Sequence, residues 1–136
     1  MNPTILVVED DLDTIKGLAI RLEASGLVIL QAISAVSALV LARAEHPDVI
    51  ILDLGLPDLS GYSILEQLKE LPATASIPVI VLTARDPQGN QERSYETGAF
   101  DFFQKPVNYK WLLKSIRRAL EKAMPNVINQ MSKNEV

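Results

Sequence analysis

Acidic side chains, one hydroxyl and one amine follow short apolar runs at intervals along this sequence of 136 residues. Glu9 and Asp10 follow the first run, Asp53 follows the third, Thr83 ends the fourth and Lys105 comes soon after the fifth. Close carboxylates repel one another, and a hard cation such as Mg²⁺, which prefers oxygen ligands, relieves that repulsion. An aspartate can also act as a nucleophile and form an aspartyl phosphate. If the fold brings them together, these residue types predict phosphoryl transfer to Asp53 with help from Mg²⁺.

The elements that must position these residues alternate between apolar runs and helical patterns. The helical patterns space their apolar residues as at Ile15, Leu18, Ala19 and Leu22, along one helix face. Continuous apolar strands are typical of a parallel sheet that helices cover on both faces. We predict a doubly wound α/β domain of the flavodoxin-like order 2-1-3-4-5, with ligands bound at the carboxyl ends of its strands. Its five strands are expected at 5–8, 27–32, 49–52, 77–82 and 100–103.

Local signals predict several helix ends. Ser34 and Asn108 are expected to cap the helices that follow them, and Gly26 is expected to end the first helix. The fourth helical segment, 88–97, is weak, because only Tyr95 offers apolar surface to the core. Gly89 would cost about 1 kcal/mol relative to alanine inside that helix. We expect this helix to be short and mobile.

Composition excludes several classes of function. Hydrophobic residues make up 48% and charged residues 22% of the chain, which suits one globular domain. The net charge of −4 argues against a nucleic-acid-binding surface. Without cysteine, the chain has no disulfide, thiolate nucleophile or cysteine metal site. No apolar stretch is long enough for a signal-peptide core or a membrane span, so we expect a cytoplasmic protein.

Together the motifs resemble one known family, the response-regulator receiver domain of two-component signalling. The resemblance covers about residues 4–121, and we therefore expect a receiver domain at 1–122 and a tail or linker at 123–136. Each motif alone is weak, but their order and their places at strand ends are specific. The motifs are Val7–Asp11, Ile50–Leu54 with Pro57 and Gly61, Val81–Ala84, and Lys105–Pro106.

The resemblance implies a role for each acidic residue. Asp53 would accept a phosphoryl group from a histidine kinase or a histidine phosphotransfer protein. Asp10 would bind Mg²⁺ directly, Glu9 would act mainly through a metal-bound water, and the backbone carbonyl of Gly55 would be a further ligand. The family is a signalling module rather than an enzyme.

The resemblance also implies a switch. Thr83 and Lys105 would bind phosphoryl oxygens, and a cis peptide bond would precede Pro106. Phe102 occupies the position of the family's aromatic switch residue. Phosphorylation would change the surface around the fourth helix, fifth strand and fifth helix and so control an unidentified downstream protein or output domain. A homodimer through the same face is compatible with this interpretation.

Other residues have plainer interpretations. Asp11 and Asp13 fit a favourable interaction with a helix dipole, and His46 is expected to face solvent. Trp111 fits either a partner contact or the seam between helix and sheet. An alternative function is a phosphatase with an aspartate nucleophile, which Asp11-Leu12-Asp13-Thr14 faintly suggests. That nucleophile would belong at the end of the first strand, and the chain has no insertion large enough for a substrate-covering cap.

Overall fold

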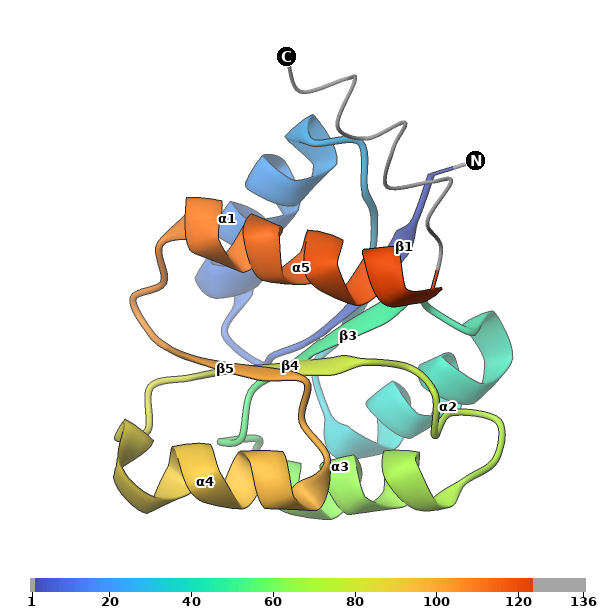
Figure 1. Cartoon of the computed structure of the whole chain (residues 1–136), viewed down its shortest axis with the longest axis vertical. Coiled ribbons are helices and arrows are strands. Elements are labelled where there is room, and N and C mark those ends of the chain that lie inside the picture. Colours follow the sequence, from blue (N-terminus) through green and yellow to red (C-terminus); the bar gives the residue numbers. More distant parts are fainter. Residues whose placement is uncertain (1, 124–136) are drawn as a thin grey trace.

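The computed structural model of the chain describes residues 2–123, which alternate between five strands and five helices (Figure 1). The strands form one parallel sheet in the order β2-β1-β3-β4-β5, which confirms the predicted topology. All of the predicted tail except Ala123 lies outside the described residues. The elements are β1 (Thr4–Val8), α1 (Leu12–Ala24), β2 (Val28–Ala32), α2 (Ala35–Glu45), β3 (Val49–Leu52), α3 (Gly61–Glu70), β4 (Val79–Thr83), α4 (Pro87–Thr97), β5 (Asp101–Gln104) and α5 (Tyr109–Ala123).

Helices cover both faces of the sheet. Figure 1 shows α1 and α5 on one face and α2, α3 and α4 on the other. Alternate residues of β1 face opposite clusters: Ile5 and Val7 pack with α1 and α5, whereas Leu6 and Val8 pack with α2 and α3. Each such side chain, when fully buried, contributes about 1.5–3 kcal/mol to stability. Within residues 2–123, no helix has the length and apolarity needed to cross a bilayer.

Three predicted helix ends are confirmed. Ser34 caps α2, since its hydroxyl oxygen accepts the Ser37 amide at 3.2 Å. Asn108 caps α5, with its side-chain oxygen 3.0 Å from the Lys110 amide nitrogen. Gly26 follows α1 with a φ of +87°, a left-handed conformation that favours glycine. The two caps fix where α2 and α5 begin, and the turn at Gly26 lets β2 begin at Val28.

The fourth helix is short, as predicted, but the residue that it buries differs from the prediction. Gln88 and Gly89 have non-helical backbone angles, so the regular helix begins only at Asn90. Gly89 has a φ of +78°, where glycine is favoured, so it lies outside the regular helix and the cost of a glycine inside a helix does not apply. Tyr95 is 42% exposed, with its hydroxyl 3.1 Å from Asp101 Oδ1 on β5, and Ser94 is buried instead. The mobility of α4 stays a prediction.

Candidate functional site

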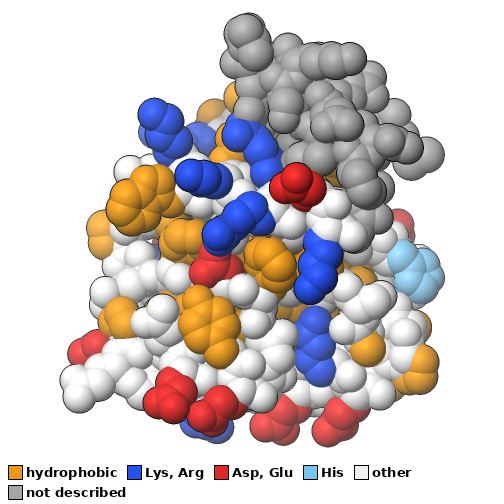
Figure 2. All heavy atoms as spheres, in the orientation of Figure 1, with side chains coloured by type: hydrophobic (Ala, Val, Ile, Leu, Met, Phe, Trp, Pro, Cys, Tyr) orange, Lys and Arg blue, Asp and Glu red, His pale blue; other side chains and the backbone are white. Residues whose placement is uncertain are grey.

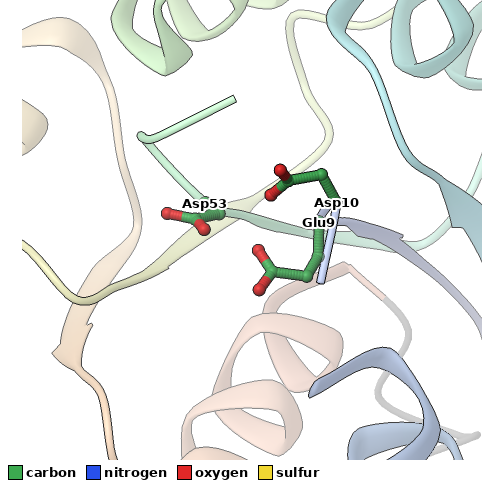
Figure 3. A group of neighbouring side chains, drawn as sticks. All are labelled: Glu9, Asp10 and Asp53. Carbon is green, nitrogen blue, oxygen red and sulfur yellow. The ribbon is translucent and has the colours of Figure 1, made fainter. Parts of the chain in front are cut away.

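Three carboxylates gather at the carboxyl ends of β1 and β3 (Figure 3). Val8 pairs with Leu52, so the residues that follow the two strands emerge side by side. One carboxylate oxygen from each of Glu9, Asp10 and Asp53 lies within 4.8 Å of the others. The predicted acidic cluster is thus brought together. Glu9 is 3% exposed and Asp10 is exposed, so one side of the cluster is dry and the other faces solvent.

Lys105 reaches the cluster from the carboxyl end of β5, the edge strand of the sheet. Its amide donates to the Thr83 carbonyl at 2.8 Å, and a cis peptide bond joins it to Pro106, as expected. The ammonium nitrogen lies 2.5 Å from a Glu9 oxygen and 3.1 Å from Asp53 Oδ2. One cation therefore bridges the end of β1 and the end of β3.

The pKa values of the three titratable groups in this contact shift with their surroundings. Burial, with the nearby Asp53 carboxylate, raises the pKa of Glu9 to about 8 although Lys105 opposes the shift. Burial would also raise the pKa of Asp53, but hydrogen bonds with Glu9 and with the Gly55 amide, together with Lys105, lower it. Burial alone would lower the pKa of Lys105, and its two carboxylate partners raise it instead. Asp53 is therefore ionised at neutral pH, which is the state that a nucleophile requires.

The donor set fits Mg²⁺. Glu9 Oε2 is buried and has no hydrogen-bond partner among the described residues, and a buried carboxylate oxygen normally requires one. A cation with bound water at the three carboxylates would satisfy it, and Mg²⁺ accepts this kind of oxygen ligand. Gly55 lies in the same loop as Asp53, and its amide donates to Asp53 Oδ1 at 3.0 Å. The metal-binding role of its carbonyl stays a prediction.

The two predicted switch residues lie in the interior. Thr83 ends β4 and is 1% exposed, with its hydroxyl oxygen 3.3 Å from the Arg85 amide nitrogen. Phe102 is 7% exposed and packs with Leu54 and Tyr62. In this structure the aromatic ring is therefore inside.

Tyr62 is a residue of this region that the sequence analysis missed. It is 2% exposed in α3, and its hydroxyl donates to Asn90 Oδ1 at 2.6 Å. The Arg93 guanidinium lies 3.8 Å from the centre of the Tyr62 ring. Tyr62 thus joins α3, α4 and the ring of Phe102. A tyrosine directly after Gly61, on the buried side of a helix, was the available signal.

The structure also places the other residues that the sequence analysis singled out. Asp11 precedes α1 and accepts the Thr14 hydroxyl at 2.5 Å, and Asp13 lies in the first turn, as their plain interpretation predicted. His46 is exposed. Trp111 is 66% exposed, so it does not cover the helix–sheet seam. Because Asp11-Leu12-Asp13 begins a helix, the structure does not favour the phosphatase alternative.

Comparison with known proteins agrees with this geometry. The profile of the response regulator receiver domain matches residues 5–117, and the chain belongs to this family. Protein PilH of Pseudomonas aeruginosa is 35% identical over 116 residues, which cover 85% of this chain and 96% of PilH. The polar-differentiation response regulator DivK of Brucella abortus is 33% identical over 120 residues, covering 88% of this chain and 98% of DivK.

Other relatives are longer than this chain. The response regulator PleD of Caulobacter vibrioides is 34% identical over 117 residues, 86% of this chain, and the match spans only 26% of PleD.

Among solved structures, a putative response regulator from Chloroflexus aurantiacus is 30% identical with a TM-score of 0.83, and the match covers 88% of this chain and 98% of that one. CheY4 of Vibrio cholerae, a chemotaxis response regulator, is 26% identical with a TM-score of 0.81, covering 88% of this chain and all of CheY4.

Proposed function

We propose that this domain accepts a phosphoryl group on Asp53 from a histidine kinase or a histidine phosphotransfer protein, in a Mg²⁺-dependent reaction in the cytoplasm. The modification changes the surface around α4, β5 and α5 and thereby controls binding of a downstream protein or output domain. The observation that carries the proposal is the position of the Lys105 ammonium, 3.1 Å from the ionised acceptor and in contact with Glu9. Family membership supports the same assignment.

The transfer step needs little covalent chemistry from the protein. An Asp53 oxygen forms a bond to phosphorus as the phosphorus–nitrogen bond of the donor phosphohistidine breaks, and the imidazole keeps the electron pair and takes up a proton. Lys105 balances the negative charge on the phosphoryl oxygens, and the Gly55 amide holds Asp53 Oδ1. Glu9, Asp10 and Asp53, with the backbone carbonyl of Gly55, would hold Mg²⁺, which would supply further charge neutralisation.

The switch follows from the charge that the phosphoryl group adds. A phosphoryl group carries about −1.5 to −2 charges at pH 7, and it requires hydrogen-bond donors. The Thr83 hydroxyl, buried at the end of β4, turns toward it, and the Phe102 ring, already inside the domain, shifts further into the space that Thr83 leaves. The phosphoryl group selects this arrangement because its contact with Thr83 exists only there.

The downstream partner binds the face of β5 and α5. Figure 2 shows basic side chains gathered over α5 on this face, with acidic ones at its lower edge. Trp111 is 66% exposed and borders a hollow that Phe103, Lys114 and Arg118 also line. Exposed tryptophan beside basic groups suits a partner with an apolar pocket and an acidic rim. The domain itself binds no nucleic acid, and a second copy of the chain is the alternative occupant of this face.

Intact-mass measurement tests the phosphorylation. The protein is incubated with acetyl phosphate with and without Mg²⁺, beside Asp53→Asn and the control Asp11→Asn, which removes an exposed carboxylate at the same end of the sheet. We expect a hydroxylamine-sensitive gain of about 80 Da that requires Mg²⁺, persists in the control and is absent from Asp53→Asn. A gain that survives Asp53→Asn would contradict the assignment.

The same samples test the switch. Amide NMR spectra of the phosphorylated protein should show shifts across residues 88–114, which include α4, β5 and the start of α5. A phosphorylated protein whose amides in this range stay unchanged would retain the acceptor site but lose the proposed switch.

A further inference from the structure

The N-terminus of α2 is capped in part by a distant loop. Backbone amides in the first turn of a helix have no intrahelical partner and require one elsewhere. The Ser37 amide has the local partner Ser34 at 3.2 Å. The Ala35 and Val36 amides instead donate to the two carboxylate oxygens of Asp58, at 2.9 and 3.3 Å. Asp58 lies 23 residues after Ala35 and 22 residues after Val36 in the chain. Asp58 therefore joins the first turn of α2 to the segment that precedes α3.

Asp58 lies in the segment that follows the phosphoryl acceptor, which we call the acceptor loop (residues 54–60). The base of this loop is fixed by backbone packing. The Gly61 amide donates to the Leu54 carbonyl at 3.0 Å, and a Cβ on Gly61 would lie 2.4 Å from Leu54 Cα. Asp58 fixes the other side of the loop by its contact with α2. Exposed Gly55 is held between these two attachments.

We propose that Asp58 is a positioning residue for the Mg²⁺ site. By tying the acceptor loop to α2, it fixes the backbone of Gly55, whose carbonyl the proposed function assigns to the metal; the inference rests on that function. Helix α2 is a firm attachment, because Ala35 and Ala38 are buried against the sheet at its first turn. Mg²⁺ demands near-octahedral geometry, so a ligand on a loose loop binds it poorly.

Asp58 has a second possible effect that an experiment must separate from positioning. Hydrogen bonds from the Ala35 amide, and then from Val36, lower the pKa of Asp58, so the exposed carboxylate is ionised at neutral pH. Its charge alone would attract Mg²⁺ without any role for the loop. Asp58→Asn removes the charge and keeps one oxygen that can accept the Ala35 amide. Asp58→Ala removes both.

Titration with Mg²⁺ alone, followed by the amide resonances of Asp53 and Gly55, tests the proposal without phosphoryl transfer. We expect Asp58→Ala to bind Mg²⁺ about tenfold more weakly, as is common when a residue supporting a metal ligand is removed. Asp58→Asn should stay within about threefold of the unmodified protein. The matched control is Ser34→Ala, which removes a cap from the same helix end but leaves the acceptor loop attached. It should bind Mg²⁺ as the unmodified protein does, while urea unfolding confirms that the cap has been lost.

Three results would overturn the proposal. Mg²⁺ affinity of Asp58→Ala within twofold of the unmodified protein would show that the attachment is unnecessary. Equal weakening in Ser34→Ala would trace the effect to fraying of α2, and equal weakening in Asp58→Asn would trace it to charge. Any of these three results, in a protein without substitutions that still takes up a phosphoryl group on Asp53, would leave the proposed function standing and overturn only the role of Asp58. If the protein without substitutions binds no Mg²⁺ at all, both the proposed function and the role of Asp58 fall.

Discussion

Tyr62 and Tyr95 carry the same hydroxyl at very different depths, and this contrast gives a sharp test of how α4 is held. Tyr62 is 2% exposed, and its hydroxyl donates to Asn90 at the start of the regular part of α4. Tyr95 is 42% exposed, and its hydroxyl lies 3.1 Å from Asp101. Replacing either tyrosine by phenylalanine removes one oxygen and leaves the ring in place.

The expected loss differs because burial differs. A buried hydrogen bond contributes about 0.5–1.5 kcal/mol net. The short 2.6 Å contact of Tyr62 places it at the upper end, so Tyr62→Phe should lower the free energy of unfolding by about 1–1.5 kcal/mol. For a chain of 136 residues this lowers the Tm by roughly 3–5 °C. Tyr95→Phe should cost less than about 0.5 kcal/mol, as is usual for exposed positions.

Urea unfolding followed by circular dichroism measures both variants. The slope of the transition should stay constant, since neither change alters the surface exposed on unfolding, and only the midpoint should move. Equal shifts in the two variants would refute the reasoning, because they would show that depth does not determine the value of the hydroxyl. A Tyr62→Phe protein as stable as the unmodified one would show that the contact with Asn90 does not hold α4.

Two further predictions concern the site. Mg²⁺ affinity should increase as pH rises from 6 to 8, by up to about tenfold per pH unit, because Glu9, with its pKa near 8, must lose a proton before the metal binds; calorimetric titration at several pH values measures this, and constant affinity over the range would contradict it. Gly61→Ala should destabilise the protein by more than about 3 kcal/mol, because its Cβ would lie 2.4 Å from Leu54 Cα and neither backbone can easily shift. Urea unfolding measures that loss, and a stable Gly61→Ala protein would show that the acceptor loop tolerates movement at its base.

Much of the fold and of the site could be predicted from the sequence, because strands buried on both faces leave an unambiguous apolar pattern. The pattern placed Glu9, Asp53 and Lys105 at strand ends, and parallel topology required those ends to meet. The pattern fails where polar contacts across elements decide the structure. Tyr95 looked apolar enough for the core, but the carboxylate of Asp101 holds its hydroxyl at the sheet edge.

Contacts between elements that are distant in the sequence could not be predicted, for the same reason. Nothing in the local sequence of Asp58 indicates that its carboxylate caps a helix 22 residues earlier. The buried hydroxyl of Tyr62 likewise depends on where α4 begins, and that start was displaced by the left-handed backbone of Gly89. Periodicity reports which face of an element is buried, whereas these contacts depend on how the elements are placed relative to one another.

The bridge made by Lys105 has a consequence for the life of the protein in the cell. Its ammonium meets Glu9, 96 residues earlier in the chain, and Asp53, 52 residues earlier. An unfolded chain therefore lacks the complete acceptor site, because Glu9, Asp53 and Lys105 meet only when three distant segments pack together. A kinase that requires this site would act only on finished molecules, so the phosphorylated pool would report completed folding as well as the incoming signal.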